Sequence, residues 1–97
     1  MKNGLSEQVV KKEVRSDGEF FYTYELVLRE GMRTADFRLP LYSVKVSMTD
    51  DKGRKSQKVV NDIFSNREHA FGFFERLVTN LATPIDLGYV VEDEVIN

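Results

Sequence analysis

His69 is the only histidine in this 97-residue sequence and the first candidate for acid–base chemistry near neutral pH. A catalytic histidine works with a nucleophile or with a carboxylate that orients its ring. Glu68 and Asp62 lie near it in the sequence, but only the folded chain decides whether they lie near it in space. A histidine on the surface of an amphipathic helix explains the same pattern. A small enzyme that uses His69 as acid or base is therefore kept as an alternative hypothesis.

Four basic residues lie around Gly53, namely Lys52, Arg54, Lys55 and Lys58. Such a cluster can bind a phosphate group or the acidic surface of a partner. The tip of a hairpin is also a place where charged side chains are readily hydrated, and no glycine-rich phosphate-binding motif accompanies the cluster. We treat Lys52, Arg54 and Lys55 as candidate contacts for a partner or a ligand.

Aromatic residues are concentrated between positions 20 and 24. Sheet platforms that stack the bases of single-stranded RNA also carry aromatic rings, which they expose on an open face flanked by positive charge. Here Tyr22 and Tyr24 share a face with two leucines, which favours packing in the core. Phe21 points to the opposite face, where with Val27 it could form an apolar patch for a partner. A single-stranded nucleic-acid binder that uses the basic hairpin and these aromatics is a second alternative hypothesis.

The composition excludes several kinds of chemistry. The sequence has no cysteine, which excludes disulfides, thiolate nucleophiles and thiolate-ligated metal centres. One histidine among scattered carboxylates matches no metal-binding spacing, so we expect neither a metal nor another cofactor. The formal charge of -2 gives no general attraction to nucleic acid or to an anionic membrane. No signal peptide and no run of about 18 apolar residues occurs, so we expect a cytoplasmic location without membrane association.

The first two thirds of the chain have the pattern of two β-hairpins. Turn signals occur at residues 17–18 and 50–53. Apolar and polar residues alternate over 20–29 and again over 42–49, which predicts strands with one buried face. The weaker alternation over 9–15 predicts an outer strand whose lysines oppose edge-to-edge aggregation.

Two further segments complete this region. Residues 56–64 follow the second turn and supply the partner strand of its hairpin. Residues 29–40 contain Gly31 and Pro40 and have no clear period. They are therefore either a connection or a bulged continuation of the strand before them.

Two helix starts follow near the C-terminus. Residues 65–68 have the spacing of a capping box with Ser65 as the N-cap, and apolar residues at helical spacing predict a helix from about 66 to 82. Residues 83–86 place a capping threonine before a proline and a carboxylate at the third helical position. A second helix should therefore begin almost at once, and the two should form a sharp corner or a short helical hairpin.

The first of these helices is apolar around more than half of its circumference, through Phe71, Phe73, Phe74 and Leu77. Such a helix should contact the sheet and one further element. The second helix is the simpler candidate for that element, and a dimer mate is the alternative. The acidic run at residues 92–94 is expected to be a solvated helix face.

Strands followed by helices predict an α+β fold. The expected architecture is a four-stranded antiparallel sheet, made of two hairpins, with two C-terminal helices packed on one face. Parallel crossovers are excluded because no helix intervenes between strands. The length fits a single domain that spans residues 1–97.

The segment from about residue 42 to 95 resembles a family of short, uncharacterised Firmicutes proteins that carry a domain of unknown function. The similarity lies in the strand and polar hairpin YSVKVSMTDDKGRK, in the element VVNDIFSN, and in the Pro-initiated segment TPIDLGYVVEDEV. The resemblance implies a small, bacterial, cytoplasmic α+β protein. It implies no activity, cofactor or catalytic residue, and it does not cover the first 41 residues.

The leading hypothesis is a non-enzymatic protein-interaction or regulatory module. The apolar residues suffice for a core, while no nucleophile, metal cage or phosphate loop occurs in the sequence. We expect a protein partner, or self-association as a homodimer, and nucleic acid is the less favoured partner. The candidate contact residues are Lys52, Arg54, Lys55, Phe21 and His69.

Overall fold

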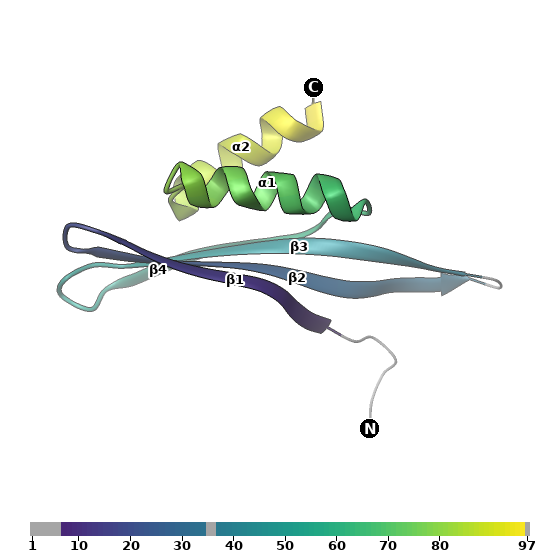
Figure 1. Cartoon of the computed structure of the whole chain (residues 1–97), viewed down its shortest axis with the longest axis horizontal. Helices are drawn as coiled ribbons and strands as arrows, with labels where there is room; N and C mark the ends of the chain where they lie inside the picture. The colour runs from purple at the N-terminus through teal and green to yellow at the C-terminus, as the bar shows by residue number, and fades with distance from the viewer. Residues whose placement is uncertain (1–6, 35–36, 97) are drawn as a thin grey trace.

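The computed structural model describes residues 7–34 and 37–96. The elements follow one another as β1 (Glu7–Asp17), β2 (Phe20–Thr34), β3 (Phe37–Thr49), β4 (Lys55–Phe64), α1 (Arg67–Thr79) and α2 (Pro84–Ile96). The strands form one antiparallel sheet in the order β1-β2-β3-β4, and both helices lie above the same face of it (Figure 1). The predicted α+β architecture is therefore confirmed. We call the uncovered face of the sheet the helix-free face.

Glycines close both of the predicted hairpin turns. Gly18 has a φ of 63° in the turn between β1 and β2, and Gly53 has a φ of 82° in the turn between β3 and β4. Residues with a side chain rarely adopt such positive values, so glycine fits these two positions best. The two turns lie at the same end of the sheet, because β1 pairs with β2 and β3 pairs with β4 in antiparallel register.

Residues 29–34 and 37–40 are bulged continuations of β2 and β3, so for these residues the interpretation as a connection is wrong, and residues 35–36 lie outside the described part of the chain. β2 and β3 remain paired from Arg29↔Leu41 to Thr34↔Phe37, with a register shift between Glu30 and Arg33. A bulge interrupts the alternation of side chains, which explains why the sequence shows no clear period there.

The core lies between the sheet and α1. Its strand residues are those of the predicted apolar faces, including Tyr24, Leu26, Val44 and Val46, all fully buried. α1 contributes Ala70, Phe73, Phe74, Leu77 and Val78, and α2 contributes Leu87. Phe71 is only partly buried and packs edge-on against Tyr42 of β3, at 6.4 Å between ring centroids. Phe71 was one of the apolar residues that suggested a further element beside α1, and the sheet itself covers part of its ring.

The N-terminal cap of α1 lies one residue later than predicted. Asn66, and not Ser65, is the N-cap, and its side-chain oxygen accepts the His69 amide at 2.8 Å. The capping-box prediction for Ser65 and Glu68 is therefore wrong. Both serine and asparagine suit an N-cap, so composition alone does not choose between neighbours.

α1 ends at Thr79, before the predicted position near residue 82. Leu81 adopts a φ of 52°, its amide donates to the Val78 carbonyl at 3.1 Å, and the Ala82 amide donates to the Leu77 carbonyl at 3.0 Å. This is the Schellman arrangement that ends helices, here with leucine where glycine is usual.

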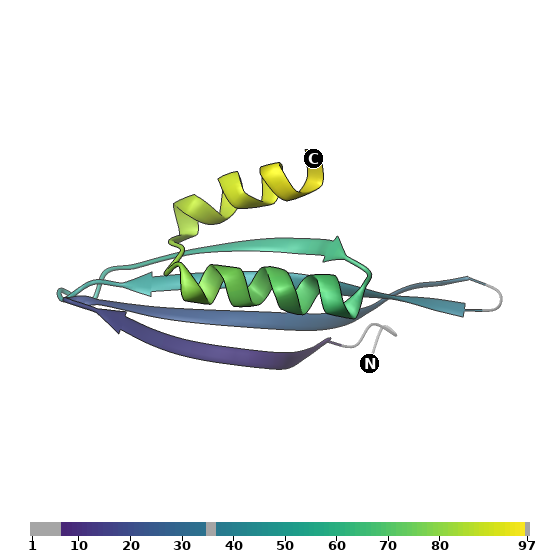
Figure 2. The same cartoon turned by 45° about the horizontal axis from the view of Figure 1, so that its top comes forward.

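The predicted start of α2 is confirmed. The Thr83 hydroxyl accepts the Asp86 amide and the Asp86 carboxylate accepts the Thr83 amide, both at 3.1 Å. The chain reverses between the helices, so that α2 runs in the opposite direction to α1 (Figure 2). α2 starts close to the sheet and rises away from it toward its C-terminal end (Figure 1). The side chains of the acidic run at residues 92–94 lie outside the described residues.

Candidate functional site

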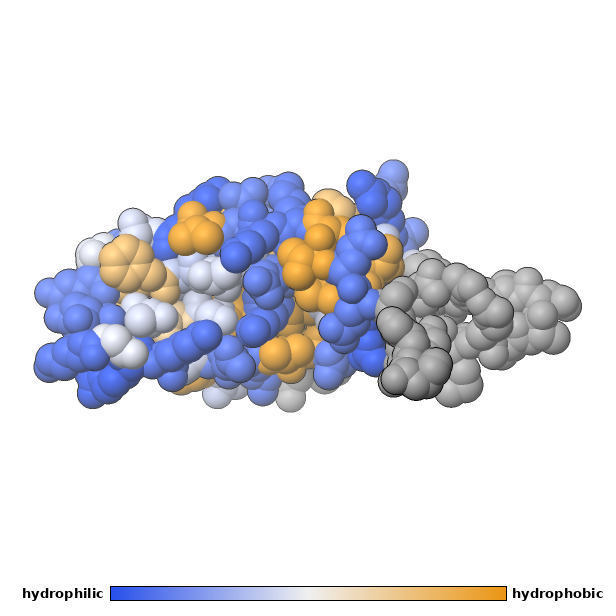
Figure 3. All heavy atoms as spheres, turned by 90° about the horizontal axis from the view of Figure 1, so that it is seen from below, coloured by the Kyte–Doolittle hydropathy of each residue, from blue (hydrophilic) through white to orange (hydrophobic). Residues whose placement is uncertain are grey.

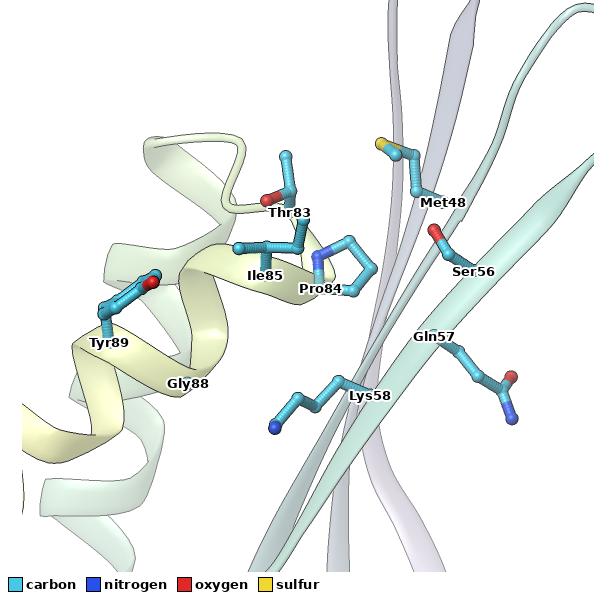
Figure 4. Close-up of a pocket in the computed structure, with 9 residues that line it drawn as sticks. All are labelled: Met48, Ser56, Gln57, Lys58, Thr83, Pro84, Ile85, Gly88 and Tyr89. Atoms are coloured by element: carbon cyan, nitrogen blue, oxygen red, sulfur yellow. The ribbon is translucent and has the colours of Figure 1, made fainter.

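A hollow lies between β4 and the first turns of α2, and we call it the β4–α2 groove. Its volume is about 560 Å³. One wall is formed by the strands and the other by the helix (Figure 4). The lining residues are Met48, Ser56, Gln57, Lys58, Thr83, Pro84, Ile85, Gly88 and Tyr89.

Local sequence signals fix the helical wall of the groove. The reciprocal Thr83–Asp86 bonds and the restricted φ of Pro84 determine where α2 begins. Just before that start, the Ala82 carbonyl accepts the buried Tyr24 hydroxyl at 2.9 Å, which ties this point of the chain to β2. Leu87 then anchors the helix in the core. The start of α2 is therefore fixed against the sheet by a hydrogen bond and by a buried side chain.

Ile85 and Tyr89 form an exposed apolar stripe on this helix. They lie four residues apart, which places them on one face of α2, away from the buried Leu87. Their side chains are 74% and 68% exposed. Large apolar residues with such exposure next to a hollow are typical of contact surfaces.

The strand wall of the groove is an open sheet edge. Among the described strands, none pairs with the outer side of β4. Residues 55–59 are all exposed. The Lys58 side chain extends toward α2 (Figure 4), and its Nζ lies 3.7 Å from the place that a Cβ on Gly88 would occupy. The lysine thus reaches across the groove to the surface of α2 at Gly88.

The end of the groove near the β3–β4 turn is positively charged. Among the described side chains, those of residues 7–29 and 41–91, no carboxylate pairs with Lys52, Lys55 or Lys58. Arg54 differs from them, because its Nε donates to the Asp50 carboxylate at 2.7 Å. The Arg54 amide above all, and then its guanidinium and the Lys52 amide, hold the pKa of Asp50 below its usual value of 3.8. Arg54 therefore shapes the turn, and the three lysines are the cations left for a partner.

The structure brings four of the five predicted contact residues to one end of the sheet. Phe21 is opposite Thr49 in the pairing of β2 with β3, and Thr49 is opposite Lys55 in the pairing of β3 with β4. Phe21 and Lys55 therefore lie in one cross-strand row on the helix-free face. Lys52 and Arg54 belong to the adjoining turn. Phe21 is 55% exposed, as the alternation predicts.

His69 lies far from this group. It is in the first turn of α1, next to the opposite end of β4, where its ring centroid is 4.6 Å from that of Phe64. In the described part of the chain, no group of three or more His, Cys, Asp or Glu side chains could hold a metal ion. The structure therefore does not join His69 to the basic cluster.

The helix-free face carries a second, smaller hollow of about 310 Å³. Val9, Val27 and Val59 line it together with polar side chains. Figure 3 shows hydrophobic groups on this face separated by hydrophilic ones. Phe21 and Val27 share the face, but six residues of strand separate them by about 20 Å. Phe21 and Val27 are therefore too far apart to form the single apolar patch that was predicted.

Sequence reasoning missed Ile85, Tyr89 and the groove itself. The spacing of Leu87 and the valines after it indicates the buried face of α2. Ile85 and Tyr89 lie four residues apart and outside that buried face, and this spacing could have indicated an exposed apolar stripe. The prediction placed Lys58 in the basic cluster but did not select it as a contact.

Comparison with known proteins gives a family without a described activity. The family of unknown function DUF6514 matches residues 5–97, which includes the region from residue 5 to 41 that the resemblance did not cover. No curated protein and no solved structure matches the chain. Within the described residues, neither α1 nor α2 combines the length and the apolar character needed to cross a membrane. The chain belongs to the family of unknown function DUF6514.

Proposed function

We propose that the protein is a non-enzymatic protein-interaction or regulatory module that binds its partner in the β4–α2 groove. The observation that carries this proposal is the combination of a hollow with an unpaired strand edge along one wall. Concave sites lined by apolar groups with a few polar ones are the usual form of binding sites. The exposed Ile85 and Tyr89 side chains add apolar area at the mouth of the groove.

A random-peptide display library, selected on the full chain, tests the proposal. We expect enriched peptides whose binding weakens about tenfold or more with Tyr89→Ala and with Ile85→Ser, because anchor side chains at the centre of an interface contribute most of the affinity. Both residues are exposed, so the fold should survive either change. Phe21→Ser is the control, since it removes another exposed apolar side chain, this one from the helix-free face.

Two results would count against this function. One is that no peptide is enriched over a library exposed to the empty support. The other is that the enriched peptides lose affinity with Phe21→Ser while Tyr89→Ala leaves them unaffected.

A single-stranded nucleic-acid binder is the second candidate, favoured by the row that joins exposed Phe21 to Lys55. Base stacking on an aromatic ring beside cations is the usual recognition mode. The burial of Tyr22 and Tyr24 leaves a much smaller platform than the sequence suggested. A labelled oligonucleotide should bind with strong salt dependence, and binding should be lost when Lys52, Arg54 and Lys55 become alanine. Absence of binding at low salt would exclude this candidate.

The proposed setting is a bacterial cytoplasm. Its support is the resemblance of residues 42–95 to Firmicutes proteins, together with a sequence that contains no cysteine. Self-association as a homodimer is part of the same proposal, because β1 presents a second sheet edge that another copy of the chain could pair with. Light scattering of the purified full chain measures its mass and decides this point.

A further inference from the structure

We infer that the groove binds an extended, acidic peptide segment that pairs with β4 as an added strand. This inference rests on the proposed function and specifies the chemistry of the partner. Three features of the site support it: the direction of the backbone groups of β4, the apolar wall of α2, and the unpaired lysines at one end.

The backbone of β4 offers hydrogen bonds along its open edge. The Asp50 amide donates to the Arg54 carbonyl at 3.0 Å, so these two residues form a hydrogen-bonded pair. Hydrogen-bonded and non-hydrogen-bonded pairs alternate along an antiparallel ladder, and the register of β4 has no shift over residues 55–60. The N–H and C=O groups directed away from β3 are therefore those of Lys55, Gln57 and Val59. A peptide in the β conformation can bond to all of them, which is the strand-addition mode of recognition.

Side chains of an added strand would alternate between the groove and the helix-free face. On the groove side they would meet Met48, Pro84, Ile85 and Tyr89, which form an apolar wall. Apolar side chains at every second position fit that wall. α2 thus serves as a ready-made cover for one face of the incoming strand.

The positive charge of three lysines favours an acidic partner. Lys58 projects into the groove and Lys55 belongs to the row on the helix-free face, while Lys52 is in the turn that closes this end. No described carboxylate neutralises any of the three. A second copy of β4 placed against this end would bring lysines against lysines, which costs affinity. Glutamate or aspartate side chains on a partner strand would instead form charge-assisted contacts.

The probes are four fluorescein-labelled octapeptides with alternating residues. The first alternates valine with glutamate, the second replaces every glutamate by glutamine, and the third replaces every glutamate by lysine. The fourth keeps glutamate and carries N-methyl groups on alternate amides, which removes half of its strand-forming N–H donors. Fluorescence anisotropy gives each affinity for the full chain.

We expect the glutamate peptide to bind about tenfold tighter than the glutamine peptide, and the lysine peptide to show no binding. The N-methylated peptide should bind with an affinity lower by about tenfold or more, because it lacks the N–H donors that would form hydrogen bonds with the β4 backbone. Lys52→Glu combined with Lys55→Glu should abolish binding of the glutamate peptide and restore binding of the lysine peptide, because the glutamates of an added strand face the helix-free side on which Lys55 lies. Lys12→Glu, on the opposite edge strand β1, is the matched control and should change neither. Lys52 and Lys55 are both exposed, and circular dichroism verifies the fold of each variant.

Equal binding of the glutamate and glutamine peptides would overturn the acidic partner but leave the interaction module standing if display-selected peptides still need Tyr89. Unchanged affinity of the N-methylated peptide would overturn strand addition. Tighter binding of a labelled oligonucleotide, in competition with the glutamate peptide for the same lysines, would also overturn it in favour of nucleic acid. A homodimer in light scattering that Lys58→Glu dissociates would assign the edge to a second copy.

Discussion

Tyr24 connects the two layers of the molecule through one hydroxyl group. The ring is fully buried in the sheet, and the hydroxyl donates to the Ala82 carbonyl between the helices, 58 residues away in the sequence. Desolvation by burial, and to a lesser degree the neighbouring Tyr22, raises the pKa of Tyr24 from 10.0 to about 12. This hydrogen bond, together with the buried Leu77, Val78 and Ala82, joins the end of α1 to the sheet.

Tyr24→Phe should lower the free energy of unfolding by about 1–2 kcal/mol. The substitution removes the hydroxyl and leaves the buried Ala82 carbonyl without this donor. Urea unfolding monitored by circular dichroism measures the change. Tyr89→Phe is the matched control, since its hydroxyl lies on an exposed residue and its loss should have little effect.

Alkaline pH should weaken the fold through the same group. Below pH 10 Tyr24 is protonated in both the folded and the unfolded chain, so its stabilising contribution is complete. Between pH 10 and about 12 the unfolded chain loses the proton while the folded chain keeps it, and the contribution declines. The free energy of unfolding should fall over this range, and less steeply in Tyr24→Phe. Equal slopes for the two proteins would contradict the assignment.

Asn66→Ala should destabilise the protein by about 1 kcal/mol, because it removes the N-cap acceptor of the His69 amide. Ser65→Ala should change the free energy of unfolding by no more than about 0.5 kcal/mol, since Ser65 is exposed and outside the cap. Thermal or urea unfolding compares the two. The reverse order of effects would restore the capping box expected from the sequence.

At the level of elements, the β3–β4 turn is organised by one carboxylate. Asp50 accepts the Lys52 and Arg54 amides through Oδ1, both at 2.9 Å, and the Arg54 guanidinium through Oδ2. The charged form of the carboxyl makes these bonds, which is why its pKa is lowered. The geometry of this turn sets the register of β4 against β3, and therefore which backbone N–H and C=O groups of β4 face outward.

Asp50→Ala should therefore lower the urea midpoint of unfolding more than Asp51→Ala, whose side chain is exposed in the same turn. The lowered pKa of Asp50 stabilises the fold above pH 3.8, and that contribution is lost as the pH falls through the folded-state value. The difference between wild type and Asp50→Ala should shrink in acid. A constant difference from pH 7 to pH 2 would show that the carboxylate charge has no part in it.

Much of the fold could be predicted because its elements carry local signals. The alternation around Tyr24 and Val46 gives the strands their buried faces, and Thr83 and Asp86 mark the start of α2 within four residues. Where two good caps stand side by side, as at Ser65 and Asn66, tertiary packing makes the choice. The continuation of β2 and β3 past residue 30 was undecided because the bulge disrupts the period.

At the scale of the whole molecule, the groove could not be predicted because it results from the angle between two elements. α2 begins close to the sheet and rises away from it toward its C-terminal end (Figure 1). A hollow lies between the first turns of α2 and β4. The contact that sets this departure point joins Tyr24 to Ala82, and no local pattern encodes a pairing over that distance. The basic cluster and the start of α2 were predicted from the sequence, but the approach of Lys58 to α2 was not.

The order of the strands in the sheet matches their order along the chain. Every strand pairing is therefore made by closing one short connection, and the entropy lost in each closure is small. Proteins whose contacts join residues near in sequence cross their folding barrier quickly. We therefore expect the hairpins to form first. The hydrogen bond between Tyr24 and Ala82 joins residues 58 apart in the sequence, so we expect the helices to dock on the sheet last.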